Sequence, residues 1–297
     1  MLSLKGWLLL ALIAVSVWFI YFWWSRFRGA AGARPPSLVH VGIGALTNFF
    51  DTLGIGSFAT TTALYKLRGL VADELIPGTL NVGHTIPTFA QAFIYIQIVQ
   101  VDPLTLVLMI IAAVLGSWLG AGAVSRWPRR QIQVGMALAL IAAATLMFLA
   151  QIGVTSAGGE ALALSGTRLW VGLAVNFFLG ALMTLGIGLY GPCLILVSLL
   201  GMVPTAAFPI MMGSCAFLMP VASVRFIERG RYHPEAALGL ALGGIPAVLV
   251  AAYLVRSLPL GAVRWLVILV VVYTAVMMLR SATREARPEA GALDATS

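Results

Sequence analysis

The chain has 297 residues, of which 61% are hydrophobic and only 9% are charged. A soluble domain carries about 25% charged residues, so this composition excludes a soluble globular protein and indicates an integral membrane protein. The net charge of +8 comes from Lys and Arg between apolar segments, a distribution typical of membrane topology and not of a nucleic-acid-binding face. Cys193 and Cys215 lie in apolar runs without CxxC spacing, so we expect neither a disulfide nor a zinc site.

The first apolar segment extends from Trp7 to Trp24. Only one basic residue precedes it, and three follow it, in the order Lys5, then Arg26, Arg28 and Arg34. The positive-inside rule therefore predicts a retained signal-anchor helix with the N-terminus outside the cell. Residues 1–37 would comprise this helix and a cytoplasmic linker.

The rest of the chain contains two similar halves. The sequence TLGIG starts at Thr52 and again at Thr184, an offset of 132 residues, and several prolines keep nearly the same offset. Each half has one long segment interrupted by Gly-Ile-Gly and three further apolar segments. We therefore predict a first transporter repeat, an extracytoplasmic linker, a second repeat and a disordered cytoplasmic tail, at residues 38–151, 152–168, 169–280 and 281–297.

Eight segments are predicted in these two repeats. In chain order they are Leu38–Leu67, Ile76–Val99, Leu104–Val124, Gln131–Gln151, Leu169–Leu200, Thr205–Ile227, Pro234–Val255 and Ala262–Leu279. The two interrupted segments, Leu38–Leu67 and Leu169–Leu200, are too long for one straight span and too short for two full spans.

The distribution of basic residues distinguishes two topologies. If each interrupted segment crosses the membrane once, 10 of the 18 Lys and Arg residues lie inside and 8 lie outside. If each enters and returns as a pair of half-helices, 14 lie inside and the other 4 lie outside, namely Lys5, Arg168, Arg256 and Arg264. The positive-inside rule favours the second arrangement. Each repeat then has three full spans, so the two repeats are inverted relative to one another.

The predicted fold class is therefore an all-α integral membrane protein. It has about seven full transmembrane helices plus two glycine-broken helices, re-entrant or discontinuous, arranged as an inverted repeat. Many secondary transporters have this organisation, and their broken helices hold the substrate near the middle of the membrane.

The paired TLGIG segments, each opening one half of the chain, resemble those of the TauE/SafE family. The resemblance covers roughly residues 38–280. It implies a bacterial permease of the inner membrane that transports sulfite, a sulfonate or another organosulfur anion.

Asp51 lies deep in an apolar segment, beside the first Gly-Ile-Gly break. A charge at the bilayer centre costs at least about 2.5 kcal/mol, so it is retained mainly where it faces a cavity or changes protonation. The equivalent residue of the second repeat is Met183, which suits a coupling site in one half. An alternative role for Asp51 is to cap the half-helix that follows the break.

His84 is the second candidate for proton coupling. Asn81, His84, Thr88 and Gln91 are spaced to form one helical stripe, and a polar stripe inside a span faces protein or water. The near-neutral pKa of histidine in water makes His84 a plausible proton carrier. A packing histidine is the alternative.

The two breaks predict an anion site, because a half-helix that begins at a break presents unpaired N–H groups and a partial positive charge. The predicted substrate-binding residues come from both breaks and from the stripe. They are Asn48, Thr52, Gly54, Gly56, Ser57, Asn81, Thr184, Gly186, Gly188 and Tyr190.

An enzyme is not expected. The three histidines, His40, His84 and His233, lie at distant positions, and neither HExxH nor GxSxG occurs. No catalytic residue, cofactor or metal is predicted.

We therefore expect a secondary transporter for a small anion, with protons as a further partner through Asp51. The chain would be a multi-pass protein of the bacterial inner membrane with its C-terminus in the cytoplasm. The lipid bilayer is then its solvent, no nucleic acid is expected, and a homo-oligomer is compatible with the sequence. The alternative is a non-catalytic accessory or assembly protein of the membrane, without transport activity of its own.

Overall fold

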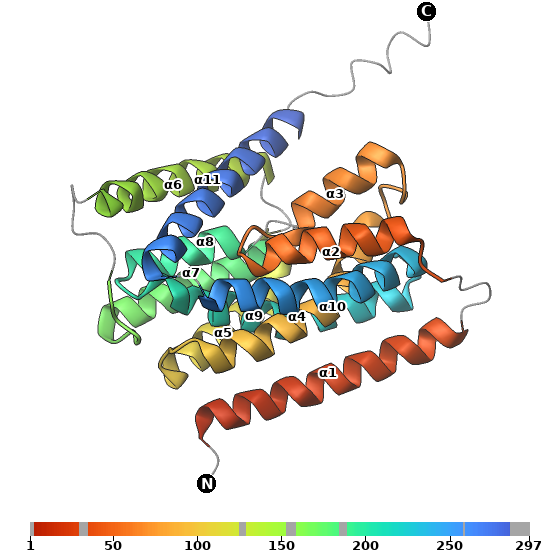
Figure 1. Cartoon of the computed structure of the whole chain (residues 1–297), viewed down its shortest axis with the longest axis horizontal. Coiled ribbons are helices and arrows are strands. Elements are labelled where there is room, and N and C mark those ends of the chain that lie inside the picture. Colours follow the sequence, from red (N-terminus) through yellow and green to blue (C-terminus); the bar gives the residue numbers. More distant parts are fainter. Residues whose placement is uncertain are drawn as a thin grey trace, which may run out of the picture.

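The computed structural model describes residues 3–29, 35–124, 129–152, 159–183, 189–257 and 259–285. Within these ranges the secondary structure is helical, apart from an isolated bridge between Ala161 and Met202. Most of the long helices run in roughly the same direction, and α1 (Leu4–Gly29) lies along one outer edge (Figure 1). This confirms the predicted all-α class.

Each uninterrupted apolar segment corresponds to one long helix, and each of the two interrupted segments corresponds to two helices. The first half contains α2 (Leu38–Thr52), α3 (Ser57–Arg68), α4 (Ile76–Ile98), α5 (Pro103–Val124) and α6 (Arg129–Gln151). The second contains α7 (Gly166–Met183), α8 (Tyr190–Leu199), the 3-10 turn η1 (Pro204–Ala206), α9 (Ala207–Glu228), α10 (Pro234–Ser257) and α11 (Leu260–Glu285).

One boundary differs from the prediction. Residues 281–285, which we assigned to the disordered tail, continue α11 to Glu285. Their sequence, Ser-Ala-Thr-Arg-Glu, contains neither glycine nor proline, so nothing in it ends the preceding helix. The rest of the predicted tail lies outside the described residues.

Among the described residues, four helical stretches are long and apolar enough to cross a membrane. They are Leu4–Phe27, Gly166–Met183, Pro204–Glu228 and Pro234–Leu254. Shorter apolar helices accompany them, for example Pro103–Leu119 and Trp265–Arg280. The length and apolar character of these helices are those expected of a membrane protein. The total of about seven full spans stays a prediction.

The packing of the helices follows the internal repeat. α2 packs on α10 and α5 packs on α7, while α4 packs on α9 and α6 packs on α11. In the internal repeat, α2, α4, α5 and α6 of the first half correspond to α7, α9, α10 and α11 of the second. Exchange of the two halves therefore turns the pair α2–α10 into the pair α7–α5, and it leaves the pairs α4–α9 and α6–α11 as they are. The similarity of the two sequence halves is therefore also present in the contacts between helices.

Each interrupted segment starts and finishes in the same neighbourhood. At the start of α2, the ring of His40 lies 5.9 Å from the ring of Tyr65, near the end of α3. Before α7, Ala161 donates its N–H to the oxygen of Gly201 at 3.2 Å, and Gly201 follows α8. The chain segments that flank each broken pair of helices therefore lie side by side.

Glycines bring the paired helices into close contact. A methyl group at Gly116 of α5 would overlap the carbonyl of Phe177 in α7, and one at Gly180 of α7 would overlap the carbonyl of Ala113 in α5. Small residues at such crossings allow two backbones to approach closely. Gly116 and Gly180 therefore allow the close packing of α5 on α7.

We predict that Gly116→Ala destabilises the protein by about 1–3 kcal/mol, because the added methyl forces α5 and α7 apart. Gly135→Ala in α6 is the matched control, since a methyl there meets nothing within 4 Å. Thermal unfolding in detergent should show a lower midpoint for Gly116→Ala only. Equal midpoints for the two variants would contradict the tight crossing.

Candidate functional site

The break between α2 and α3 is made by two glycines in left-handed conformations. Gly54 has φ 97° and Gly56 has φ 83°, angles that other residues rarely adopt. Gly54 is also close to α8, because a methyl group there would lie 3.3 Å from the side chain of Leu194. The Gly-Ile-Gly break of the first repeat therefore interrupts the helix at its predicted position. Its counterpart, with Thr184, Gly186 and Gly188, lies outside the described residues.

Asp51, in the last turn of α2, is 3% exposed and directs its carboxylate at this break. Its Oδ1 atom accepts the backbone N–H of Ser57 at 2.6 Å, and its Oδ2 atom accepts the side-chain amide of Gln91 at 2.9 Å. Ser57 is the first residue of α3, so the carboxylate sits on the positive end of this helix. The capping contact that the sequence left open is present, together with a second contact to α4.

Gln91 connects the two repeats. Its amide nitrogen also lies 3.0 Å from the hydroxyl of Thr52, and its amide oxygen accepts the hydroxyl of Tyr190 at 3.1 Å. Tyr190 begins α8 in the second repeat, whereas Gln91 belongs to α4 in the first. Gln91 was not among our predicted binding residues. Its position on the polar stripe is the sequence signal that could have identified it.

His84 is fully buried between α2 and α3. Its Nε2 atom lies 3.1 Å from the hydroxyl of Thr61, and its Nδ1 atom lies 3.1 Å from the amide oxygen of Asn48. The Asn48 amide nitrogen already donates to the carbonyl of Gly44 at 2.8 Å. A neutral His84 therefore carries its proton on Nδ1 and accepts the Thr61 hydroxyl at Nε2.

Only part of the polar stripe on α4 contacts the residues around Asp51 and His84. His84, Thr88 and Gln91 are buried, as expected for a stripe that faces protein. Asn81 is half-buried, and its amide donates to the carbonyl of Pro77 in its own helix at 3.0 Å. In the part of the chain that the structure describes, no hydrogen bond joins the Asn81 side chain to Asp51 or His84.

Nine of the residues discussed above form what we call the buried polar network. All have exposed fractions of 7% or less. They are Asn48, Asp51, Thr52, Ser57, Thr61, His84, Thr88, Gln91 and Tyr190. The network has amide, hydroxyl, imidazole and backbone N–H groups around one carboxylate. Such donors suit a negatively charged oxygen, and carboxyl and imidazole groups are of the kinds that hold or release a proton.

Residues 2–147 match the family described as "Sulfite exporter TauE/SafE". This match confirms the resemblance to the TauE/SafE family in the first half of the chain, and the predicted resemblance of the second repeat stays a prediction. The match starts before residue 38, where we predicted the resemblance to start, and it ends within α6. It therefore includes Asp51, His84 and Gln91 but not Tyr190. No curated protein and no solved structure matches the chain. TauE/SafE proteins are permeases, and the family implies transport of sulfite or an organosulfur anion across a membrane.

Two of the three histidines are neighbours, which corrects the view that all three lie apart. The rings of His40 and His233 have their centres 6.0 Å from one another. The described residues nevertheless contain no group of three or more His, Cys, Asp or Glu that could hold a metal ion.

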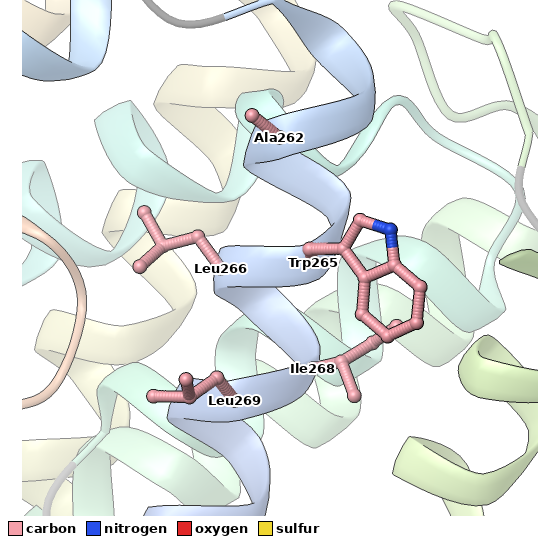
Figure 2. Close-up of a pocket in the computed structure, with 5 residues that line it drawn as sticks. All are labelled: Ala262, Trp265, Leu266, Ile268 and Leu269. Carbon is pink, nitrogen blue, oxygen red and sulfur yellow. The ribbon is translucent and has the colours of Figure 1, made fainter.

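A pocket on α11 lies outside the buried polar network. Figure 2 shows that its lining consists of apolar side chains along one stretch of this helix, namely Ala262, Trp265, Leu266, Ile268 and Leu269. The indole N–H of Trp265 is the one hydrogen-bond donor among these side chains, so the pocket is poorly suited to an anion.

We predict that Tyr190→Phe destabilises the protein by about 1–3 kcal/mol, because the buried amide oxygen of Gln91 loses its donor. Tyr253→Phe is the control, since Tyr253 is 78% exposed. The measurement is again the unfolding midpoint in detergent. If both Tyr→Phe variants unfold at the wild-type temperature, the link between the repeats does not contribute to stability.

Proposed function

We propose that the protein is a secondary transporter of the bacterial inner membrane that moves sulfite or an organosulfur anion such as a sulfonate, coupled to protons through Asp51. The observation that carries this proposal is the Asp51 carboxylate on the N-terminus of α3, buried among hydrogen-bond donors from both repeats. The family supplies the class of permease.

The proposed architecture is an inverted repeat in which α2–α3 and α7–α8 are re-entrant. Two features support it. The flanks of each broken pair lie side by side, as expected if the chain enters the membrane and returns. The helix pairs also interchange when the two halves are exchanged, as expected for a two-fold relation between them. In this topology the N-terminus is outside and the C-terminus is cytoplasmic.

The proposed anion site is the position that the Asp51 carboxylate now takes. A carboxylate and a sulfonate or sulfite present the same kind of negatively charged oxygen. The donors that satisfy Asp51, the Ser57 N–H and the Gln91 amide, are therefore suited to hold such an oxygen. Thr52 adds a hydroxyl beside Gln91. The carboxylate acts as a built-in competitor of the substrate.

Protonation of Asp51 would couple the two solutes. An ionised Asp51 carboxylate repels an incoming anion and occupies the hydrogen-bond donors that the anion needs. A neutral carboxyl group carries no charge and binds these donors more weakly. Anion and proton therefore bind together and leave together. With the cell interior negative, export of an anion gains about 2.3 kcal/mol per charge per 100 mV. A co-transported proton cancels one charge, so the proton gradient would then contribute to the direction of transport.

We predict that Asp51→Asn abolishes the pH dependence of transport. The measurement is uptake of a sulfonate into proteoliposomes at zero membrane potential, because a sulfonate keeps its charge across the pH range. The wild-type rate should rise as the pH falls, approaching about tenfold per pH unit where Asp51 is mostly ionised. The variant should have one rate at every pH, because Asn cannot titrate.

Asp73→Asn provides the control, since Asp73 is exposed and pairs with Lys66 on the surface. This variant should keep the wild-type pH profile. An Asp51→Asn protein with the same pH profile as the wild type would refute the coupling role. Transport of neither the sulfonate nor sulfite by folded wild-type protein would refute the proposed substrate class.

A further inference from the structure

The buried face of α3 is made entirely of hydroxyl-bearing residues. Its three buried positions are Ser57, Thr61 and Tyr65, spaced four residues apart. Residues four apart on a helix lie one above the other, so the three hydroxyls follow one line along α3. An apolar bundle would be stabilised by aliphatic side chains at these positions, which makes a line of hydroxyl groups unusual for packing alone.

The line extends past Tyr65 to the two neighbouring histidines. The ring of Tyr65 lies 5.9 Å from that of His40, and the ring of His40 lies 6.0 Å from that of His233. His40 and Tyr65 are buried, while His233 is half-buried. The ring of His40 contacts Tyr65 of α3 and His233, which precedes α10, and His40 interacts electrostatically with Glu235 in the first turn of α10.

Three polar atoms at this end are buried without a hydrogen-bond partner among the described residues. They are the Nδ1 and Nε2 atoms of His40 and the hydroxyl of Tyr65. Burial of such atoms is costly unless water or a proton donor satisfies them. All three are able to bind water, and the phenol and imidazole groups are also able to pass protons.

At its inner end the line reaches the buried polar network directly. Thr61, one turn from Tyr65, contacts the Nε2 atom of His84 at 3.1 Å. Because the Nδ1 atom of a neutral His84 carries the proton, Nε2 is the free basic atom and faces Thr61. His84 in turn contacts Asn48, which lies three residues before Asp51 on α2.

We propose that His233, His40, Tyr65, Thr61 and His84 form a proton path from the membrane surface to the buried polar network. The path rests on the proposed proton-coupled transport and names the route by which its protons enter. A proton taken up by His233 passes through the His40 and Tyr65 groups and bridging waters. The Thr61 hydroxyl then donates its proton to Nε2 of His84 and receives one from the outer side, so each group is restored and His84 becomes the cation.

Tyr65→Phe is the variant that tests this path, because it removes only the hydroxyl and keeps the ring that packs on His40. Thr61→Val removes the second hydroxyl, and Thr61→Ser retains it. Thr62→Val, on the less buried side of α3, is the matched control for loss of a threonine hydroxyl.

Two rates are measured on the same proteoliposomes. The first is sulfite counterflow at equal pH on both sides, which needs the anion site but no net proton movement. The second is proton entry driven by an inward gradient of a sulfonate at zero membrane potential, reported by a pH-sensitive dye inside the vesicles. We expect Tyr65→Phe and Thr61→Val to lower the proton rate at least about tenfold, and we expect Tyr65→Phe, which lies outside the buried polar network, to retain counterflow. Thr61→Ser should restore the proton rate, and Thr62→Val should match the wild type in both rates.

The outcomes separate this path from the proposed function. Proton entry that is equal in wild type, Tyr65→Phe and Thr61→Val, or absent in the wild type, would overturn the path. Proton entry that depends on the two hydroxyls, in a protein without sulfite counterflow, would support the path and reject sulfite as the substrate.

Discussion

A carboxylate placed inside an apolar helix bundle needs hydrogen-bond donors, and the rest of the site is arranged around that need. Asp51 obtains one donor because the helix is broken between α2 and α3, which exposes the N–H of Ser57. The break depends on Gly54 and Gly56, whose positive φ angles redirect the chain. The second donor comes from Gln91 on α4, and Gln91 is in turn bonded to Tyr190 of the other repeat. A single charge thus connects four helices of both repeats, and any change in that charge acts on all of them.

The two repeats share a plan of packing but differ in chemistry. The position equivalent to Asp51 is Met183, and the position equivalent to His84 is Ala216. The Sγ atom of Cys215, next to Ala216, lies 3.6 Å from the Sδ atom of Met183, so this part of the second repeat presents soft, weakly polar sulfur atoms in place of ionisable groups. One repeat therefore carries the titratable residues, while the other contributes an apolar wall and the hydroxyl of Tyr190. This asymmetry allows one coupling site to exist within a nearly symmetric arrangement of helices.

The sequence was sufficient for the features that depend on local patterns. Apolar length predicted the helices, the doubled TLGIG predicted the break at Gly54 to Gly56, and the spacing along α4 predicted that His84 and Gln91 face protein. It could not predict contacts between distant segments. The partner of Gln91 is Tyr190, 99 residues away, and the neighbour of His40 is His233, whose proximity depends on how α2 packs on α10. Asn81 fits the same spacing as His84 but lies too far along α4, because helical periodicity gives the face of a residue and not its depth along the bundle.

The central claim is that the substrate anion and a proton together replace the ionised carboxylate of Asp51. Calorimetric titration of the purified protein with a sulfonate, in two buffers of different ionisation enthalpy, measures the number of protons taken up for each anion bound. The account predicts uptake approaching about one proton per anion at a pH where Asp51 is ionised, and none in Asp51→Asn. Saturable binding of the anion to the wild type with no proton uptake at any pH would contradict it.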